Sequence, residues 1–226
     1  MPKGGDAATV FKNIMTFRRS SFTKVRARKA HSGDSQLIQI VDSALADATR
    51  RSGDWLVCRP GCTQCCIGVF AINQLDAHRL RQGLAGLEAA APQRAAHVRE
   101  RARDFVARFA REFPGDPATG VLDEGEIAEQ RFAEFANDEA CPALDPATGN
   151  CELYDSRPMT CRTFGPPVRS EEGLGVCELC FHGASDEEIA ACEMIPDPDD
   201  LELALLQELE RTTGARGETI VAFALV

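Results

Sequence analysis

Four cysteines fall within nine residues of this chain, at Cys58, Cys62, Cys65 and Cys66, around a Pro-Gly dipeptide. An isolated cysteine is most simply explained as a buried apolar residue, but that explanation is poor for four thiols so close together beside a turn. Two thiolates that lie two residues apart on a turn can both reach one ion at about 2.3 Å, the usual zinc–sulfur distance. This segment is therefore predicted to be a loop that binds metal.

Six further cysteines form two more groups later in the chain. They are Cys141, Cys151 and Cys161, with nine residues between neighbours, and Cys177 and Cys180, followed by Cys192. A closed zinc site takes four ligands, and a cubane iron–sulfur cluster takes about four thiolates. Ten cysteines could therefore fill two such sites and leave two over.

Two residues near the third group are compatible with either of two roles. Cys192 stands alone and could be a ligand or simply pack, and His182 could replace a thiolate, although a lone histidine is more often a surface or core residue. The predicted metal ligands are the nine other cysteines: Cys58, Cys62, Cys65, Cys66, Cys141, Cys151, Cys161, Cys177 and Cys180.

The rest of the composition favours metal over disulfides. With 226 residues, 44% of them hydrophobic, the chain can bury a core without crosslinks. The first 35 residues lack the continuous apolar segment of a secretory signal, and no run approaches the roughly 18 apolar residues of a membrane span. We therefore expect a cytoplasmic, reduced protein whose cysteines bind zinc or iron, with disulfides as the alternative.

Charge is unevenly distributed along the chain. Residues 1–32 hold eight Lys or Arg and one acid, whereas the whole chain has a net charge of −10. This acidity argues against dedicated nucleic-acid binding, which needs a basic face. Residues 1–34 are predicted to be a basic, disordered tail that is either solvated or in contact with RNA, an acidic partner or the chain's own acidic body. The partner, a protein or a small molecule, is not defined by the sequence.

Apolar spacing predicts a mainly α fold, in which a helical scaffold flanks an irregular, loop-rich cysteine-cluster region. Helices are expected over 35–50 with Ser35 as cap, 74–90, 92–113, 124–137, and 199–212 with Gly214 as stop signal, and a short strand over Thr219–Leu225. Residues 35–195 are predicted to form the metal-binding domain, with the C-terminal helix and tail of 196–226 packed on it. Antiparallel helices between Cys66 and Cys141 would let one site use both cysteines.

Three segments together resemble a known family. They are Gly-Cys-Thr-Gln-Cys-Cys at 61–66, Cys-Pro-Ala-Leu at 141–144, and Cys-Glu-Leu-Tyr-Asp-Ser-Arg-Pro-Met-Thr-Cys-Arg-Thr-Phe-Gly at 151–165. Over about residues 55–182 the chain resembles the YkgJ-type cysteine-cluster family, the zinc- or iron-chelating CxxCxxCC domain that is also found in flagellin lysine N-methylase. The resemblance implies that the first seven cysteines face the metal and that Cys177 or Cys180 supplies a late cysteine. The methylase suggests an iron–sulfur centre, but no methyl-donor pocket is recognisable here.

Charged and aromatic neighbours surround Cys161 and Cys151. Arg157 and Arg162 could offset the negative charge of thiolates and donate hydrogen bonds to sulfur, could bind an anionic substrate, or could form salt bridges with Asp155 or Glu152. Tyr154 is expected to pack against the loop between the two cysteines.

Three functions remain open at this stage. The first is a metal-binding protein whose metal is structural or carried, and the second is an iron–sulfur oxidoreductase or protein-modifying enzyme, methylase-like, with an open cluster position. The third is a zinc-stabilised interaction module with acidic helices as its docking face. Cysteine spacing does not choose between zinc and iron, because thiolates serve both.

Overall fold

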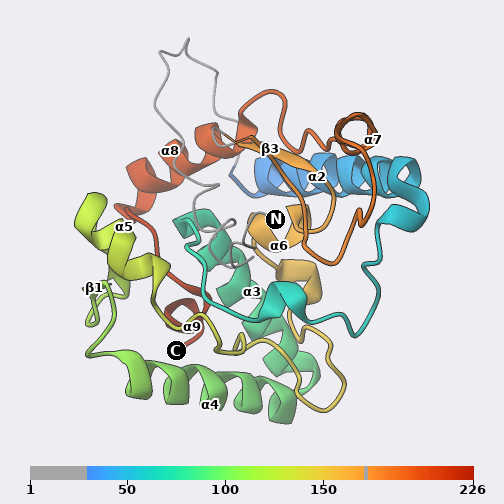
Figure 1. Ribbon diagram of the computed structural model, residues 1–226. Helices are drawn as coiled ribbons and strands as arrows, with labels where there is room; N and C mark the ends of the chain where they lie inside the picture. Colours follow the sequence, from blue (N-terminus) through green and yellow to red (C-terminus); the bar gives the residue numbers. More distant parts are fainter. Residues whose placement is uncertain (1–29, 171–172) are drawn as a thin grey trace. The chain divides into compact units, whose positions relative to one another are not determined.

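The computed structural model describes residues 30–170 and 173–226 (Figure 1). Most of the predicted basic tail, including Arg18, Arg19 and Lys24, lies outside the described residues. The fold is mainly α, as predicted, and its strands form two short two-stranded hairpins among the described residues. No helix in this part of the chain has the length and apolar character needed to cross a bilayer.

The chain divides into two compact units, which are described separately below. Unit 1 comprises the chain up to Cys58 together with Arg162–Ala215, and unit 2 comprises Arg59–Cys161 together with Arg216–Val226. Cys58, Cys177, Cys180 and Cys192 therefore belong to unit 1. The other six cysteines belong to unit 2: Cys62, Cys65, Cys66, Cys141, Cys151 and Cys161.

Unit 2 is built on two long helices, α3 (Gln74–Ala90) and α4 (Pro92–Phe109), which pack against each other (Figure 1). The Asn73 side chain accepts a hydrogen bond from the backbone N–H of Asp76 at 2.9 Å, which caps α3. Pro92 begins α4, where its missing N–H costs nothing. The buried faces of the two helices form one core with Ile72, Ala143, Leu153, Val221, Ala224 and Leu225.

The smaller elements of unit 2 complete a second, aromatic cluster. They are the strands β1 (Gly115–Asp116) and β2 (Val121–Leu122) and the helices α5 (Glu126–Ala133) and α9 (Val221–Ala224). Phe105, Phe113, Phe132 and Phe135 gather there with Ile220 and Ala222. Helix α4 ends earlier than the predicted residue 113, and α5 is shorter than the predicted 124–137.

The strand predicted over Thr219–Leu225 is wrong, because the segment forms helix α9. Only Thr219 pairs in strand fashion, with Ile72, through N–H···O bonds of 2.8 and 2.9 Å. Consecutive residues Ile220, Val221 and Ala222 are all buried. A strand with one exposed face would bury every second residue, whereas a helical turn enclosed by α3 and α4 buries neighbours.

Unit 1 contains α2 (Ala30–Ser52), which packs against α8 (Leu201–Thr213). Because α2 begins at Ala30, Ser35 lies inside the helix, and its predicted role as cap is wrong. Gly214 ends α8 in the left-handed conformation, at φ +73°, as predicted. The remaining elements are α7 (Asp186–Ala191) and the strands β3 (Val168–Ser170) and β4 (Gly173–Gly175), while α6 (Met159–Thr163) spans the boundary between the units.

A pentapeptide, Asp-Pro-Ala-Thr-Gly, occurs at 116–120 and again at 145–149, and both copies form the same hairpin turn. In each, the aspartate carboxylate accepts from the alanine N–H, at 2.9 and 3.1 Å, and from the threonine hydroxyl, at 2.8 and 2.6 Å. The glycine N–H donates to the aspartate carbonyl at 2.8 Å in both copies, and the glycine φ is +71° and +70°. The second copy lies between two cysteines of unit 2.

Candidate metal centre

The first cysteine group, apart from Cys58, meets the second group in unit 2. The backbone N–H of Cys141 donates to the carbonyl of Cys66 at 2.7 Å, and Ile67 forms an antiparallel bridge with Ala140. The helices between residues 66 and 141 therefore return the chain to its starting point, which confirms the predicted excursion. Cys65 and Cys66 lie on a 3₁₀ turn over Gln64–Cys66.

Cys151 is placed by the hairpin that carries the second pentapeptide turn. It pairs with Leu144 in an antiparallel bridge, and the N–H of Asp145 donates to the carbonyl of Asn150 at 2.8 Å. Cys141 joins the same arm through the bond from the Leu144 N–H to its carbonyl, at 2.9 Å. Both half-buried cysteines pack against the α3–α4 core, so the hairpin holds them at a common surface.

Cys161 is placed by a buried ion pair on α3. The carboxylate of Asp76 accepts from the Arg79 guanidinium at 2.6 Å and from the backbone N–H of Met159 at 3.1 Å. Asp76 is fully buried and Arg79 nearly so. A charged acceptor at the first residue of α6 fixes the start of that short helix, and Cys161 follows two residues later.

Cys62 lies in the loop before the 3₁₀ turn. Its N–H donates to the carbonyl of Arg59 at 2.9 Å, and its side chain is half-buried. The neighbouring Gly61 lies against the second pentapeptide turn, since a Cβ on Gly149 would be 3.4 Å from the Gly61 carbonyl. The Cys62 loop therefore runs beside the hairpin that carries Cys151.

Five thiols of unit 2 lie within electrostatic range of one another. A hydrogen bond from Cys66 lowers the pKa of Cys65 to about 7, and the same bond, with burial, raises the pKa of Cys66. Burial raises the pKa of Cys141 to about 12 and also raises the pKa of Cys151. Burial, with the neighbouring thiols and Asp76, holds the pKa of Cys161 well above its ordinary value.

Arg157 supplies positive charge beside these thiols. Its guanidinium contributes to lowering the pKa of Cys65 and acts in the same direction on Cys151. Nη1 donates to the carbonyl of Tyr154 at 2.9 Å, and the guanidinium carbon lies 3.9 Å from the centre of the tyrosine ring. Tyr154 is 59% exposed and stacks on Arg157, which lies in the loop between Cys151 and Cys161, so the tyrosine packs against this loop as expected.

The other predicted partners differ from expectation. Arg162 is buried in unit 1, where Nη1 contacts Asp42 Oδ1 at 2.6 Å, an acid that sequence reasoning did not consider. Glu152 forms its ion pair with Arg94. The pairs Arg162–Asp42 and Arg94–Glu152 join residues that lie far apart in the sequence, so local spacing could not identify them.

The third cysteine group lies in unit 1. Cys177, Cys180 and Cys192 are buried in one cluster, and Cys58 is the fourth cysteine of this unit. His182 is exposed. None of the ten cysteines, all of which the structure describes, forms a disulfide.

The thiols are gathered but do not form a complete coordination shell. Among residues 30–170 and 173–226, no group of three or more His, Cys, Asp or Glu side chains has metal-binding geometry. The donor set nevertheless fits a soft cation, because all six ligand candidates in unit 2 are sulfur. Binding zinc or iron there would require the side chains of these gathered cysteines to rotate towards one ion.

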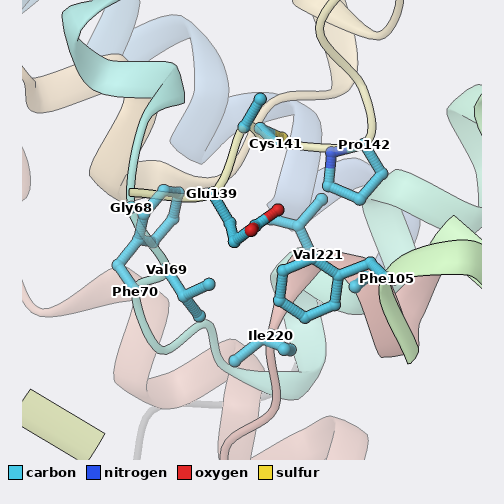
Figure 2. A pocket seen from close by; sticks show the side chains of 11 residues that line it. Gly68, Val69, Phe70, Phe105, Glu139, Cys141, Pro142, Ile220 and Val221 are labelled. Atoms are coloured by element: carbon cyan, nitrogen blue, oxygen red, sulfur yellow. The ribbon is translucent and has the colours of Figure 1, made fainter. Parts of the chain in front are cut away.

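A small cavity lies beside Cys141 in unit 2 (Figure 2). Its volume is about 20 Å³, and it is lined on one side by Glu139, Cys141 and Pro142 and on the other by Phe105 and Val221. A space of this size holds about one water molecule. It is too small to admit a substrate to the thiols.

Clustered thiols on a helical scaffold define unit 2 as a cysteine-cluster protein with the donor set of a metal chelator. Residues 57–181, more than half of the chain, match the CxxCxxCC family, described as a putative zinc- or iron-chelating domain, and the chain belongs to this family. This result confirms the resemblance to the YkgJ-type domain that the motifs indicated. No curated protein and no solved structure showed significant similarity to the chain.

Proposed function

We propose that this protein binds zinc or iron through the six cysteines of unit 2, and that the metal is structural or carried. The observation that supports the proposal most directly is the meeting of five thiols, each affecting the ionisation of others. Membership of a family described as chelating zinc or iron adds to it. Cys62 is included because its loop lies beside the hairpin of Cys151.

The electrostatics explain what a cation would contribute. Burial keeps the pKa values of Cys141, Cys151 and Cys161 above the ordinary thiol value, so these groups are neutral at pH 7 without a positive charge. A bound cation favours their thiolates and releases protons as it binds. Because the ligands come from segments far apart in the sequence, binding also stabilises the tertiary contacts among them.

The metal would be held by Cys62, by the two adjacent thiols of the 3₁₀ turn and by Cys141, Cys151 and Cys161. When bound, zinc would supply a closed structural centre, whereas an iron–sulfur cluster would supply electron transfer or an open coordination position. Arg157 would offset the charge of the thiolates and donate hydrogen bonds towards them. These roles belong to the side chains whatever the metal is.

A second candidate is an iron–sulfur enzyme, an oxidoreductase or a protein-modifying enzyme. The feature that favours it is the number of thiols, because six exceed the four that one closed zinc site takes. A cluster ligated by some of them would leave others free to act near it.

Metal analysis of the full chain, purified without oxygen, tests the proposal. Stoichiometric zinc in a colourless protein supports a structural or carried metal, and brown protein whose visible absorption bleaches on reduction supports the iron–sulfur candidate. A Cys151→Ser and Cys161→Ser double variant should lose the metal. The matched control is Met159→Leu, which preserves volume in the same short helix and should keep it.

Native protein without bound zinc or iron would contradict both candidates. So would a double variant that remains folded, by circular dichroism, and keeps the wild-type metal content.

A further inference from the structure

A second group of thiols is gathered in unit 1. Cys177, Cys180 and Cys192 are only 2%, 5% and 5% exposed, and they pack in one cluster with Phe181. Trp55, Leu56 and Phe164 pack around this cluster. The Cys177–Cys180 pair and Cys192, twelve residues further along the chain, thus share one apolar cluster.

Cys177 and Cys180 lie on a turn suited to two thiolates on one ion. The N–H of Cys180 donates to the carbonyl of Cys177 at 2.9 Å, which closes the turn. The next residue, Phe181, has φ +59°, a conformation that is rare for a bulky side chain. The chain holds it there with a bond of 2.9 Å from the Phe181 N–H to the carbonyl of Trp55. Strain of this kind persists where the surroundings fix the backbone, commonly at functional sites.

Cys192 is held on both sides by one arginine. Nη1 of Arg51 donates to the carbonyl of Ala191 at 2.6 Å, and Nη2 donates to the carbonyl of Glu193 at 2.9 Å. The Glu193 carboxylate is in turn bound by Arg169 at 2.6 Å. The backbone around this cysteine is therefore fixed by charged contacts at the end of α7.

Cys58 reaches the same region through Gly165. A Cβ at Gly165 would lie 2.8 Å from Sγ of Cys58, so the glycine leaves room for that sulfur. The carbonyl of Gly165 accepts from the Cys177 N–H at 3.4 Å. Gly165 therefore touches both the first cysteine and the start of the Cys177–Cys180 turn.

We propose that Cys58, Cys177, Cys180 and Cys192 form a second thiolate centre, separate from the six cysteines of unit 2, that binds one zinc ion. Four sulfurs match the ligand number of a closed structural zinc site, and the Cys-x2-Cys turn supplies half of it. As in unit 2, the thiols must rotate to coordinate, since they are gathered without metal-binding geometry in the described residues. Cys192 lies beyond residues 57–181, so this centre extends past the chelating domain.

The ion would stabilise unit 1 by joining three segments that are separated in the sequence. They are the loop that follows α2 and contains Cys58, the 177–180 turn and the end of α7. A structural zinc site contributes its binding free energy to folding when the ligands are far apart in sequence.

The zinc content of the full chain tests this centre. Wild-type protein and variants are purified under reducing conditions, loaded with Zn²⁺, freed of excess ion and measured by mass spectrometry of the metal, with circular dichroism as a check of folding. Cys180→Ala and Cys192→Ala keep a small apolar side chain in the cluster, so a cysteine that only packs tolerates the change. Each variant is expected to lose one zinc equivalent per chain. The matched control is Met194→Leu, which preserves the volume of a buried side chain in the same unit and should keep the wild-type zinc content.

Folded Cys180→Ala and Cys192→Ala proteins with the wild-type zinc content would overturn the second centre, whatever unit 2 binds. Combining Cys180→Ala with the unit 2 changes Cys151→Ser and Cys161→Ser should add the two losses of metal when the centres are separate, so the two proposals fail separately.

If the unit 1 variants do not fold, the proposal is tested on the wild-type protein by chelation and thiol alkylation. Zinc is withdrawn with increasing chelator, reactive thiols are alkylated in brief pulses, and the modified peptides are mapped. We expect Cys177, Cys180 and Cys192 to become reactive together as one zinc equivalent leaves. Their alkylation without zinc release, or a disulfide joining Cys177 to Cys180 in the native protein, would overturn the proposal.

Discussion

The backbone N–H of Cys141 donates to the carbonyl of Cys66 at 2.7 Å, although 74 residues separate them in the chain. This bond joins the first cysteine group to the hairpin that carries Cys151. The two long helices α3 and α4 lie within the intervening segment, so their packing brings the two groups together. The gathering of these thiols in unit 2 therefore depends on the helical core as much as on the cysteines.

The repeated turn provides a prediction with a built-in control. Asp145→Ala removes the acceptor of the Ala147 N–H and the Thr148 hydroxyl, and should destabilise the protein by about 1 kcal/mol, the usual size for such hydrogen bonds. Because this turn sets the position of Cys151, metal content should fall as well. Asp116→Ala removes the same bonds from the other copy and should lower stability without loss of metal.

Denaturant titration and metal analysis of the two variants measure these effects. Equal metal content in both would show that the second turn does not position Cys151.

The buried ion pair beneath α6 should be costly to break. Asp76→Ala leaves the Arg79 guanidinium buried without its closest carboxylate, and removing one partner of a buried pair typically costs about 3–5 kcal/mol. The control is Asp47→Ala, which breaks two exposed pairs on α2, with Arg50 and Arg51; 50% of the aspartate side chain and 71% and 38% of the arginine side chains are accessible. Exposed pairs on a helix contribute about 0.2–0.5 kcal/mol each, so the control should lose about 1 kcal/mol at most.

Urea unfolding followed by circular dichroism compares the two variants. Similar losses of stability in both would contradict the role given to Asp76.

Cys65 should be more reactive than Cys66, Cys141, Cys151 and Cys161 in metal-free protein near neutral pH. Its pKa is lowered to about 7, chiefly by the hydrogen bond from Cys66, while the pKa of Cys141 is raised by burial to about 12. The thiolate is the reactive form, so the alkylation rate of Cys65 should rise through a midpoint near pH 7. Arg157→Gln removes a positive charge, raises this pKa and slows the reaction at pH 7.

Alkylation rates mapped to individual peptides over pH 5–10 provide the measurement, with Arg81→Gln on the exposed side of α3 as control. A Cys65 midpoint at the ordinary thiol value of 9.0 would refute the prediction.

Gly165 should be sensitive because of the sulfur beside it. Gly165→Ala introduces a Cβ 2.8 Å from Sγ of Cys58 and 3.3 Å from Cδ1 of Leu56 at φ +119°, whereas a Cβ at Gly173, at φ +126°, meets no described residue within 4 Å. Unfavourable φ alone should cost each variant about 1 kcal/mol or more. The extra loss of unfolding free energy in Gly165→Ala, measured by denaturant titration, reports the close contact with Cys58, together with the milder one with Leu56. No difference between the two variants would mean that Cys58 moves away freely.

Local patterns in the sequence correctly identified those helices and helix ends that are determined by neighbouring residues. Apolar spacing and end signals located α3 at 74–90 and the end of α8 at Gly214, because helix formation and its termination are decided within a few residues. The family followed from short motifs around the cysteines. The repeated pentapeptide was also visible in the sequence, but two copies of a short turn do not make a repeat of fixed period, which is the usual sign of a repeat fold.

Only the tertiary structure decided which distant groups meet. The pairing of Arg162 with Asp42, the helical form of Val221–Ala224, and the division of the ten cysteines into six and four all depend on contacts between remote segments. The sequence alone determined that this chain carries thiols at spacings suited to metal within a mainly helical protein. Which thiols gather was settled by the packing of α3, α4 and the hairpins, because the burial of apolar surface, rather than local spacing, selects long-range contacts.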